Sequence, residues 1–127
     1  MKQNVMLTIT SLLSILLMTF HLADDIIRGF EQGGLKNLTG VLILVVLLYG
    51  TLVLAGRRSG YVIILLGGLL ASGMPVIHMR GKGVGGEIAT SGAFFFVWTL
   101  LALGVTGLFS VILSARGLWS LRRGQSR

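Results

Sequence analysis

The sequence predicts an all-α membrane protein in which four transmembrane helices form an up-down bundle. Three observations predict this fold. Only 12% of the 127 residues are charged, whereas a soluble domain carries roughly 25%. The charges fall in short clusters, and the stretches between the clusters are almost uncharged. Four of these stretches have the roughly 20 apolar residues that a helix needs to cross about 30 Å of hydrocarbon.

The four predicted spans cover about 4–23, 38–55, 60–79 and 88–115, and a basic interfacial tail follows over 116–127. Together they make one transmembrane domain, 1–127. Because lipid offers the backbone no hydrogen-bond partner, each span must be helical. A β-barrel would need alternating strands of about ten residues, and the sequence shows no such pattern. The fourth span is long enough to tilt or to extend beyond the membrane surface.

The basic residues predict the orientation of these spans. One side of the membrane receives seven basic residues and no acid: Lys2, Arg57, Arg58, Arg116, Arg122, Arg123 and Arg127. The other side receives all four acids. The positive-inside rule then places both termini in the cytoplasm of a multi-pass protein, in the inner membrane of a bacterial cell. A cleaved signal peptide is the alternative for the first span, but His21 stands where a cut after Ala23 needs a small residue.

Composition excludes several classes of function. The chain has no cysteine, which excludes disulfides, thiolate metal sites and iron–sulfur clusters. The net charge of +7 could indicate nucleic acid, but the basic residues flank apolar runs. They therefore indicate topology and contacts with membrane lipids, with no nucleic-acid partner. No phosphate loop, nucleotide fingerprint or zinc-protease helix is present, so no enzymatic activity is expected.

Small residues predict how the helices pack, because lipid is as apolar as leucine and cannot drive their association. The fourth span carries a stripe at four-residue spacing, and the third span offers a matching pair. The stripe is Ala102, Thr106, Ser110 and Ser114, and the pair is Gly67 and Ala71. We expect these two spans to lie tightly together. Pro75 predicts either a bend or an early end in the third span.

The tail is expected to lie at the lipid interface. Trp119 suits headgroup depth, and Arg122 and Arg123 would meet anionic lipid. A disordered basic tail that serves only the orientation rule is the alternative.

A short sequence occurs twice and favours duplication. The stretches 28–34 and 80–86 both read R-G-x-x-x-G-G, each follows a span, and each has a histidine upstream, His21 or His78. This pattern is typical of two duplicated helical hairpins in parallel orientation. Coincidence is the alternative, since the chain has 19 glycines.

Few ionisable residues lie near the apolar spans, and they gather at the predicted outer face. From His21, the residues Asp24, Asp25 and Arg28 follow at three, four and seven positions. On a helix that continues past the membrane edge, His21, Asp25 and Arg28 share one face. Because the first and third spans run in the same direction, His78 is expected at the same depth as His21.

Three interpretations of this cluster are open. In the first, the carboxylates pair with arginines and fix the helix ends. In the second, His21 and His78 bind haem, or His21, Asp24, Asp25 and His78 bind a divalent metal. In the third, the cluster handles protons or ions in a small transporter. The first predicts a structural or accessory subunit that self-associates or joins a larger membrane complex. The others predict a haem- or metal-binding protein or a transporter.

Overall fold

The computed structural model describes residues 2–31, 33–80 and 93–124, and these form a helical bundle without a strand. The elements are α1 (Lys2–Ile27), the 3-10 helix η1 (Gly34–Asn37), α2 (Leu38–Leu52), α3 (Arg58–Arg80) and α4 (Ala93–Arg122). Four segments are long and apolar enough to cross a membrane, α2 being counted together with η1. The predicted all-α fold with four membrane-length helices is therefore confirmed.

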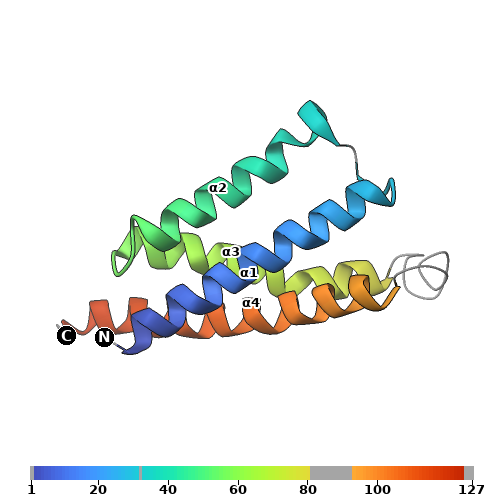
Figure 1. Ribbon diagram of the computed structural model, residues 1–127. Helices are drawn as coiled ribbons and strands as arrows, with labels where there is room; N and C mark the ends of the chain where they lie inside the picture. Colours follow the sequence, from blue (N-terminus) through green and yellow to red (C-terminus); the bar gives the residue numbers. More distant parts are fainter. Residues whose placement is uncertain (1, 32, 81–92, 125–127) are drawn as a thin grey trace.

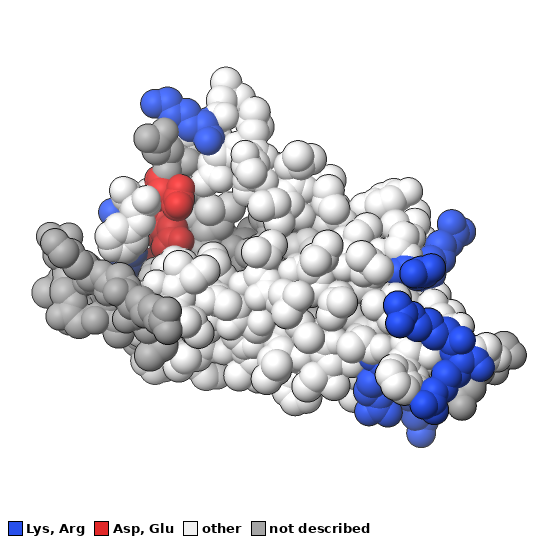
Figure 2. Space-filling view, turned by 180° about the vertical axis from the view of Figure 1, so that it is seen from behind, with Lys and Arg blue, Asp and Glu red and all other residues white. Residues whose placement is uncertain are grey.

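The helices alternate in direction, so the two ends of the bundle differ in charge. Both termini and the turn between α2 and α3 lie at the same end (Figure 1). We call it the basic end, because it holds Lys2, Arg57, Arg58, Arg116, Arg122 and Arg123. The opposite end, here the histidine end, holds His21, His78 and the described acids. Figure 2 shows the acids at one extreme of the molecule and most of the basic side chains at the other.

Helix bounds differ from the predicted spans at several ends. α1 continues one turn beyond residue 23, to Ile27, and there the amides of Phe30 and Glu31 donate to the carbonyl oxygen of Asp25. Gly29 allows this close return because its φ is +76°. α4 extends to Arg122, so the first part of the predicted tail is helical. The start of the predicted fourth span, 88–92, and the second R-G-x-x-x-G-G copy beyond Arg80 lie outside the described residues.

The contact between α3 and α4 depends on small residues. A Cβ atom on Gly107 would lie 2.7 Å from the Cβ of Ala71 and 2.9 Å from the carbonyl oxygen of Gly68, so the two backbones touch. In the predicted stripe, Ser110 and Ser114 are buried, whereas Ala102 and Thr106 are half-buried.

Pro75 lies inside α3, which continues to Arg80. Its ring fits against α4 at Gly104, where an added Cβ would meet Pro75 Cγ at 2.7 Å. Gly67, which the sequence analysis paired with the stripe on the fourth span, packs against the side chain of Leu47 on α2.

The inner face of α1 carries polar residues toward the histidine end. Its buried residues are Leu7, Ser11, Ser14, His21 and Asp25, which follow helical spacing. The hydroxyls of Ser11 and Thr51 are 2.7 Å apart and link α1 to α2. By contrast, α2 buries only residues in its second half, Leu47, Gly50 and Thr51.

Candidate metal centre

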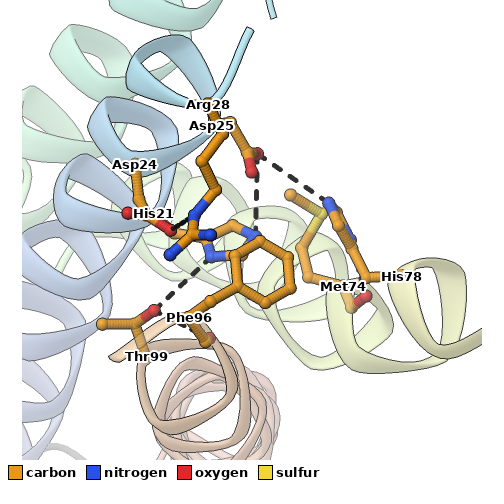
Figure 3. A network of polar contacts seen from close by, with 8 residues as sticks. All are labelled: His21, Asp24, Asp25, Arg28, Met74, His78, Phe96 and Thr99. Carbon is orange, nitrogen blue, oxygen red and sulfur yellow. Dashed lines mark hydrogen bonds and ion pairs between the residues drawn. The ribbon is translucent and has the colours of Figure 1, made fainter. Parts of the chain in front are cut away.

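Three ionisable side chains meet inside the histidine end (Figure 3). His21 and Asp25 lie one turn apart on α1, and His78 comes from the last turns of α3. Asp25 Oδ2 is 3.7 Å from Nε2 of His21 and 3.8 Å from Nε2 of His78. The three ligand atoms all lie within 4.8 Å of one another. The exposed fractions of the side chains are 1% for His21, 8% for Asp25 and 25% for His78.

The second ring nitrogen of each histidine is held by an oxygen. Nδ1 of His78 is 3.0 Å from the backbone carbonyl oxygen of Met74. A carbonyl oxygen can only accept, so this Nδ1 carries the hydrogen. Nε2 of a neutral His78 is then an unprotonated acceptor that faces Asp25.

The same reasoning applies to His21. Its Nδ1 lies 3.5 Å from the hydroxyl of Thr99, and that hydroxyl donates its one hydrogen to the carbonyl oxygen of Phe96 at 3.0 Å. Thr99 is therefore the acceptor and Nδ1 of His21 the donor. Two imidazole lone pairs consequently point toward one carboxylate oxygen, an arrangement that a positive charge between them would stabilise.

Two polar atoms of this cluster are buried and unpaired. Among the described residues, Nε2 of His21 and Oδ1 of Asp25 have no hydrogen-bond partner. Leaving such an atom unsatisfied costs about 1–3 kcal/mol, and more for a charged group. The arrangement therefore retains unused ligand capacity.

Phe96 on α4 forms an apolar wall beside the cluster. The centre of its ring is 4.8 Å from that of His21 and 6.0 Å from that of His78. The two imidazole centres are 4.9 Å apart, edge to face. An apolar wall of this kind lowers the local dielectric and strengthens electrostatic interactions within the cluster.

Asp24, which the sequence placed in the same candidate site, has a different partner. Its Oδ2 accepts a hydrogen bond of 2.7 Å from Nε of Arg28, one turn along α1. The Arg28 guanidinium also lies 5.8 Å from the centre of the Phe96 ring. Asp24 thus compensates a nearby positive charge, and Asp25 is the carboxylate that faces the imidazoles.

Sequence reasoning did not identify Phe96, Thr99 or the Met74 carbonyl as parts of the site. One feature of the sequence did indicate Phe96 and Thr99. The fourth span runs opposite to the first and third, so its first turns must lie at the level of His21 and His78.

The predicted interfacial residues lie at the basic end of the bundle. Trp119 is 58% exposed, and the Arg123 guanidinium lies 4.6 Å from the centre of its ring. Arg122 is the last residue of α4 and is exposed.

Comparison of the chain with protein-family models, curated proteins and solved structures found no match in any of the three. The cluster itself offers two imidazoles and one carboxylate, and Nδ1 of each ring already contacts an oxygen.

Proposed function

We propose that this chain is a multi-pass membrane protein that binds one divalent transition-metal ion through His21, Asp25 and His78. One observation carries the proposal. Nε2 of both imidazoles faces Oδ2 of the same carboxylate, while Nδ1 of both is held by an oxygen. Metal-binding histidines commonly donate their second ring N–H to a carbonyl or similar acceptor, which fixes the tautomer.

The distances favour a metal ion over a shared proton. A side-chain hydrogen bond between these atoms would have to be shorter than about 3.6 Å, and the measured separations are 3.7 and 3.8 Å. Two ligands of a tetrahedral ion with bonds of roughly 2.0–2.1 Å lie about 3.3 Å apart. The separations of 3.7 and 3.8 Å from Asp25 Oδ2 are therefore closer to the spacing of two metal ligands than to a hydrogen bond of usual length.

The same geometry favours an ion over haem. A haem bound by both histidines needs its ring plane between the two Nε2 atoms. Asp25 Oδ2 lies within 3.8 Å of both Nε2 atoms, so its carboxylate would have to leave. Imidazole and carboxylate together suit zinc, iron, nickel or copper, whereas magnesium and calcium prefer oxygen alone.

The ion would join α1 to α3 and keep a coordination position open. Three protein ligands leave room for water or another small ligand at a four-coordinate ion. The partial exposure of His78 puts the open side away from the buried His21. The positive-inside rule predicts that the basic end faces the cytoplasm. The site then opens to the outer side of the inner membrane of the cell.

Metal titration of the purified protein tests the proposal. Protein in detergent is stripped with a chelator and titrated with Zn²⁺ and Co²⁺, the latter followed by its visible absorption. We expect one ion per chain. Each of the variants His21→Ala, Asp25→Asn and His78→Ala should lower the affinity by at least about tenfold.

Asp24→Asn is the matched control, because it removes the same charge one residue away from Asp25. It should stay within about threefold of the natural protein, since its carboxylate binds Arg28. Equal losses in Asp24→Asn and Asp25→Asn would show a diffuse acidic effect and contradict the proposed ligand set.

A second candidate is the accessory subunit that self-associates or joins a larger complex. It is favoured by an apolar groove of about 260 Å³ between α2 and α3, lined by side chains that include Leu42, Val46, Leu66 and Leu70. Light scattering of the detergent-solubilised protein tests the self-associating form, for which a monomer would be contrary evidence. Metal titration and light scattering report independently, so each candidate can fail alone.

A further inference from the structure

A second hollow lies at the basic end, far along the bundle from the metal centre. It has a volume of about 480 Å³ and lies between the first turn of α1 and the last turns of α4. Its lining residues are Gln3, Ala115, Arg116, Trp119 and Ser120. This lining combines a cation, an amide, a hydroxyl and an indole ring, which suits a ligand with both polar and apolar parts.

Charge at this end favours an anionic ligand. Arg116 lines the hollow, the other five described basic residues of the basic end lie at the same end of the bundle, and the described acids lie at the histidine end (Figure 2). Arg116 is exposed and forms no ion pair with any residue that the structure describes. Its guanidinium can therefore offer two parallel N–H donors to a phosphate.

The surface becomes apolar one turn deeper into the membrane. On α1, Met6 follows Gln3 by one helical turn and is 54% exposed. On α4, Ile112 precedes Arg116 by one turn and is 46% exposed. Residues three or four apart share a helix face, so the polar hollow continues into an apolar surface on both helices.

We propose that this hollow binds the headgroup of an anionic phospholipid. Arg116 contacts the phosphate, the Trp119 ring lies at headgroup depth, and the acyl chains follow Met6 and Ile112. The apolar continuation distinguishes a lipid from free phosphate, which has no part to place there. Arg123 stays over the Trp119 ring and orients the indole.

Lipid retention in detergent provides the first test. The full chain is purified with an equimolar mixture of phosphatidylglycerol and phosphatidylcholine, and bound lipid is counted by native mass spectrometry. We expect preferential retention of about one phosphatidylglycerol. Arg116→Gln should lower that retention about fivefold, the contribution expected of one arginine at a lipid surface.

Arg58→Gln is the matched control, because it removes the same charge from the same end but lies on α3, away from the hollow. An equal loss in both variants would show diffuse attraction and overturn the proposal. Equal retention of the two lipids would also overturn it. If millimolar inorganic phosphate displaced the bound phosphatidylglycerol, the hollow would be a site for free phosphate, and the proposal of a lipid site would be wrong.

A second measurement does not depend on the stability of the Arg116 variant. The chain has two tryptophans, so Trp98→Phe leaves Trp119 as the only indole emitter. Brominated phosphatidylglycerol should quench Trp119 at least twofold more than brominated phosphatidylcholine at equal mole fraction. Equal quenching by the two lipids would mean that no specific lipid lies beside Trp119.

Discussion

At the residue scale, the hydroxyl of Thr99 determines which nitrogen of His21 is available. The Thr99 hydroxyl donates its hydrogen to the Phe96 carbonyl oxygen, so toward Nδ1 of His21 this hydroxyl can act only as an acceptor. Nε2 is then left with a lone pair aimed at Asp25. The Met74 carbonyl oxygen has the same effect on His78. The site thus depends on two acceptors that need not touch the ion.

Thr99→Val should weaken metal binding without removing a ligand. The valine cannot accept from Nδ1, so the His21 ring loses its fixed tautomer, and the loss of such a partner typically costs 10–100-fold in metal affinity. Thr99→Ser should restore most of the affinity. The measurement is the cobalt titration described above.

Thr106→Val serves as the control, because Thr106 is a half-buried threonine of α4 whose hydroxyl contacts only backbone oxygens. It should bind metal normally. If Thr99→Val also bound normally, the hydroxyl would have no part in orienting His21.

Acidification should release the ion. Both imidazoles must be unprotonated to bind it, so protons compete with the metal at His21 and His78. Affinity should fall as the pH is lowered, by up to about tenfold per pH unit for each proton displaced. Zinc titrations at several pH values, together with proton release in weak buffer, measure this directly. An affinity that stayed constant on acidification would contradict binding through the two imidazoles.

At the element scale, the backbone contact of α3 with α4 at Gly107 makes a specific demand on side-chain size. Gly107→Ala places a Cβ 2.7 Å from the backbone nitrogen of Ser72 and from the Cβ of Ala71, so the helices must separate. We expect a loss of about 1–3 kcal/mol in the free energy of unfolding, the usual effect of overpacking. Unfolding in mixed detergent micelles, followed by circular dichroism, measures the difference.

Gly73→Ala is the matched control on the facing helix. An added Cβ there meets nothing within 4 Å, and alanine favours a helix over glycine by about 1 kcal/mol. Its stability should therefore be unchanged or slightly higher. Equal destabilisation by both substitutions would mean that the helix contact does not pass through Gly107.

The sequence predicted the elements well, for a physical reason. A membrane-spanning segment must be a long apolar helix, so the apolar stretches of the sequence locate the helices. The charged residues that flank each stretch mark roughly where each helix ends. The predicted first span ended at residue 23, and its continuation past the membrane edge was only a condition for the shared face, because the amide contacts of Phe30 and Glu31 with Asp25 form only after the chain has turned. The extra turn of α1 places Asp25 on the same helix as His21.

The site was predicted less completely than the fold. Helical spacing related His21 to Asp25, and span direction put His78 at the same depth. Spacing could not separate Asp24 from Asp25, because adjacent residues lie only about 100° apart on a helix and rotation about its axis is decided by packing. For the same reason the contribution of Phe96 and Thr99 became visible only with α4 in place.

At the scale of the whole molecule, the bundle keeps its two proposed binding regions at opposite ends. The proposed metal ligands lie at the histidine end, and the proposed lipid site lies at the basic end, with the apolar body of the four helices between them. The proposal of an outward-facing metal centre therefore depends on the orientation of the chain, which charge alone predicts.

Cysteine labelling should show that the basic end faces the cytoplasm. The chain has no cysteine, so each introduced thiol reports alone. Leu35→Cys lies beside the histidine end and Ser59→Cys beside the basic end, both at exposed positions. A membrane-impermeant maleimide applied to intact cells should label Leu35→Cys, whereas Ser59→Cys should react only after the membrane is opened, because arginine-rich turns stay on the cytoplasmic side. Labelling of Ser59→Cys in intact cells would put His21, Asp25 and His78 on the cytoplasmic side, and the ion would then come from the cytoplasm.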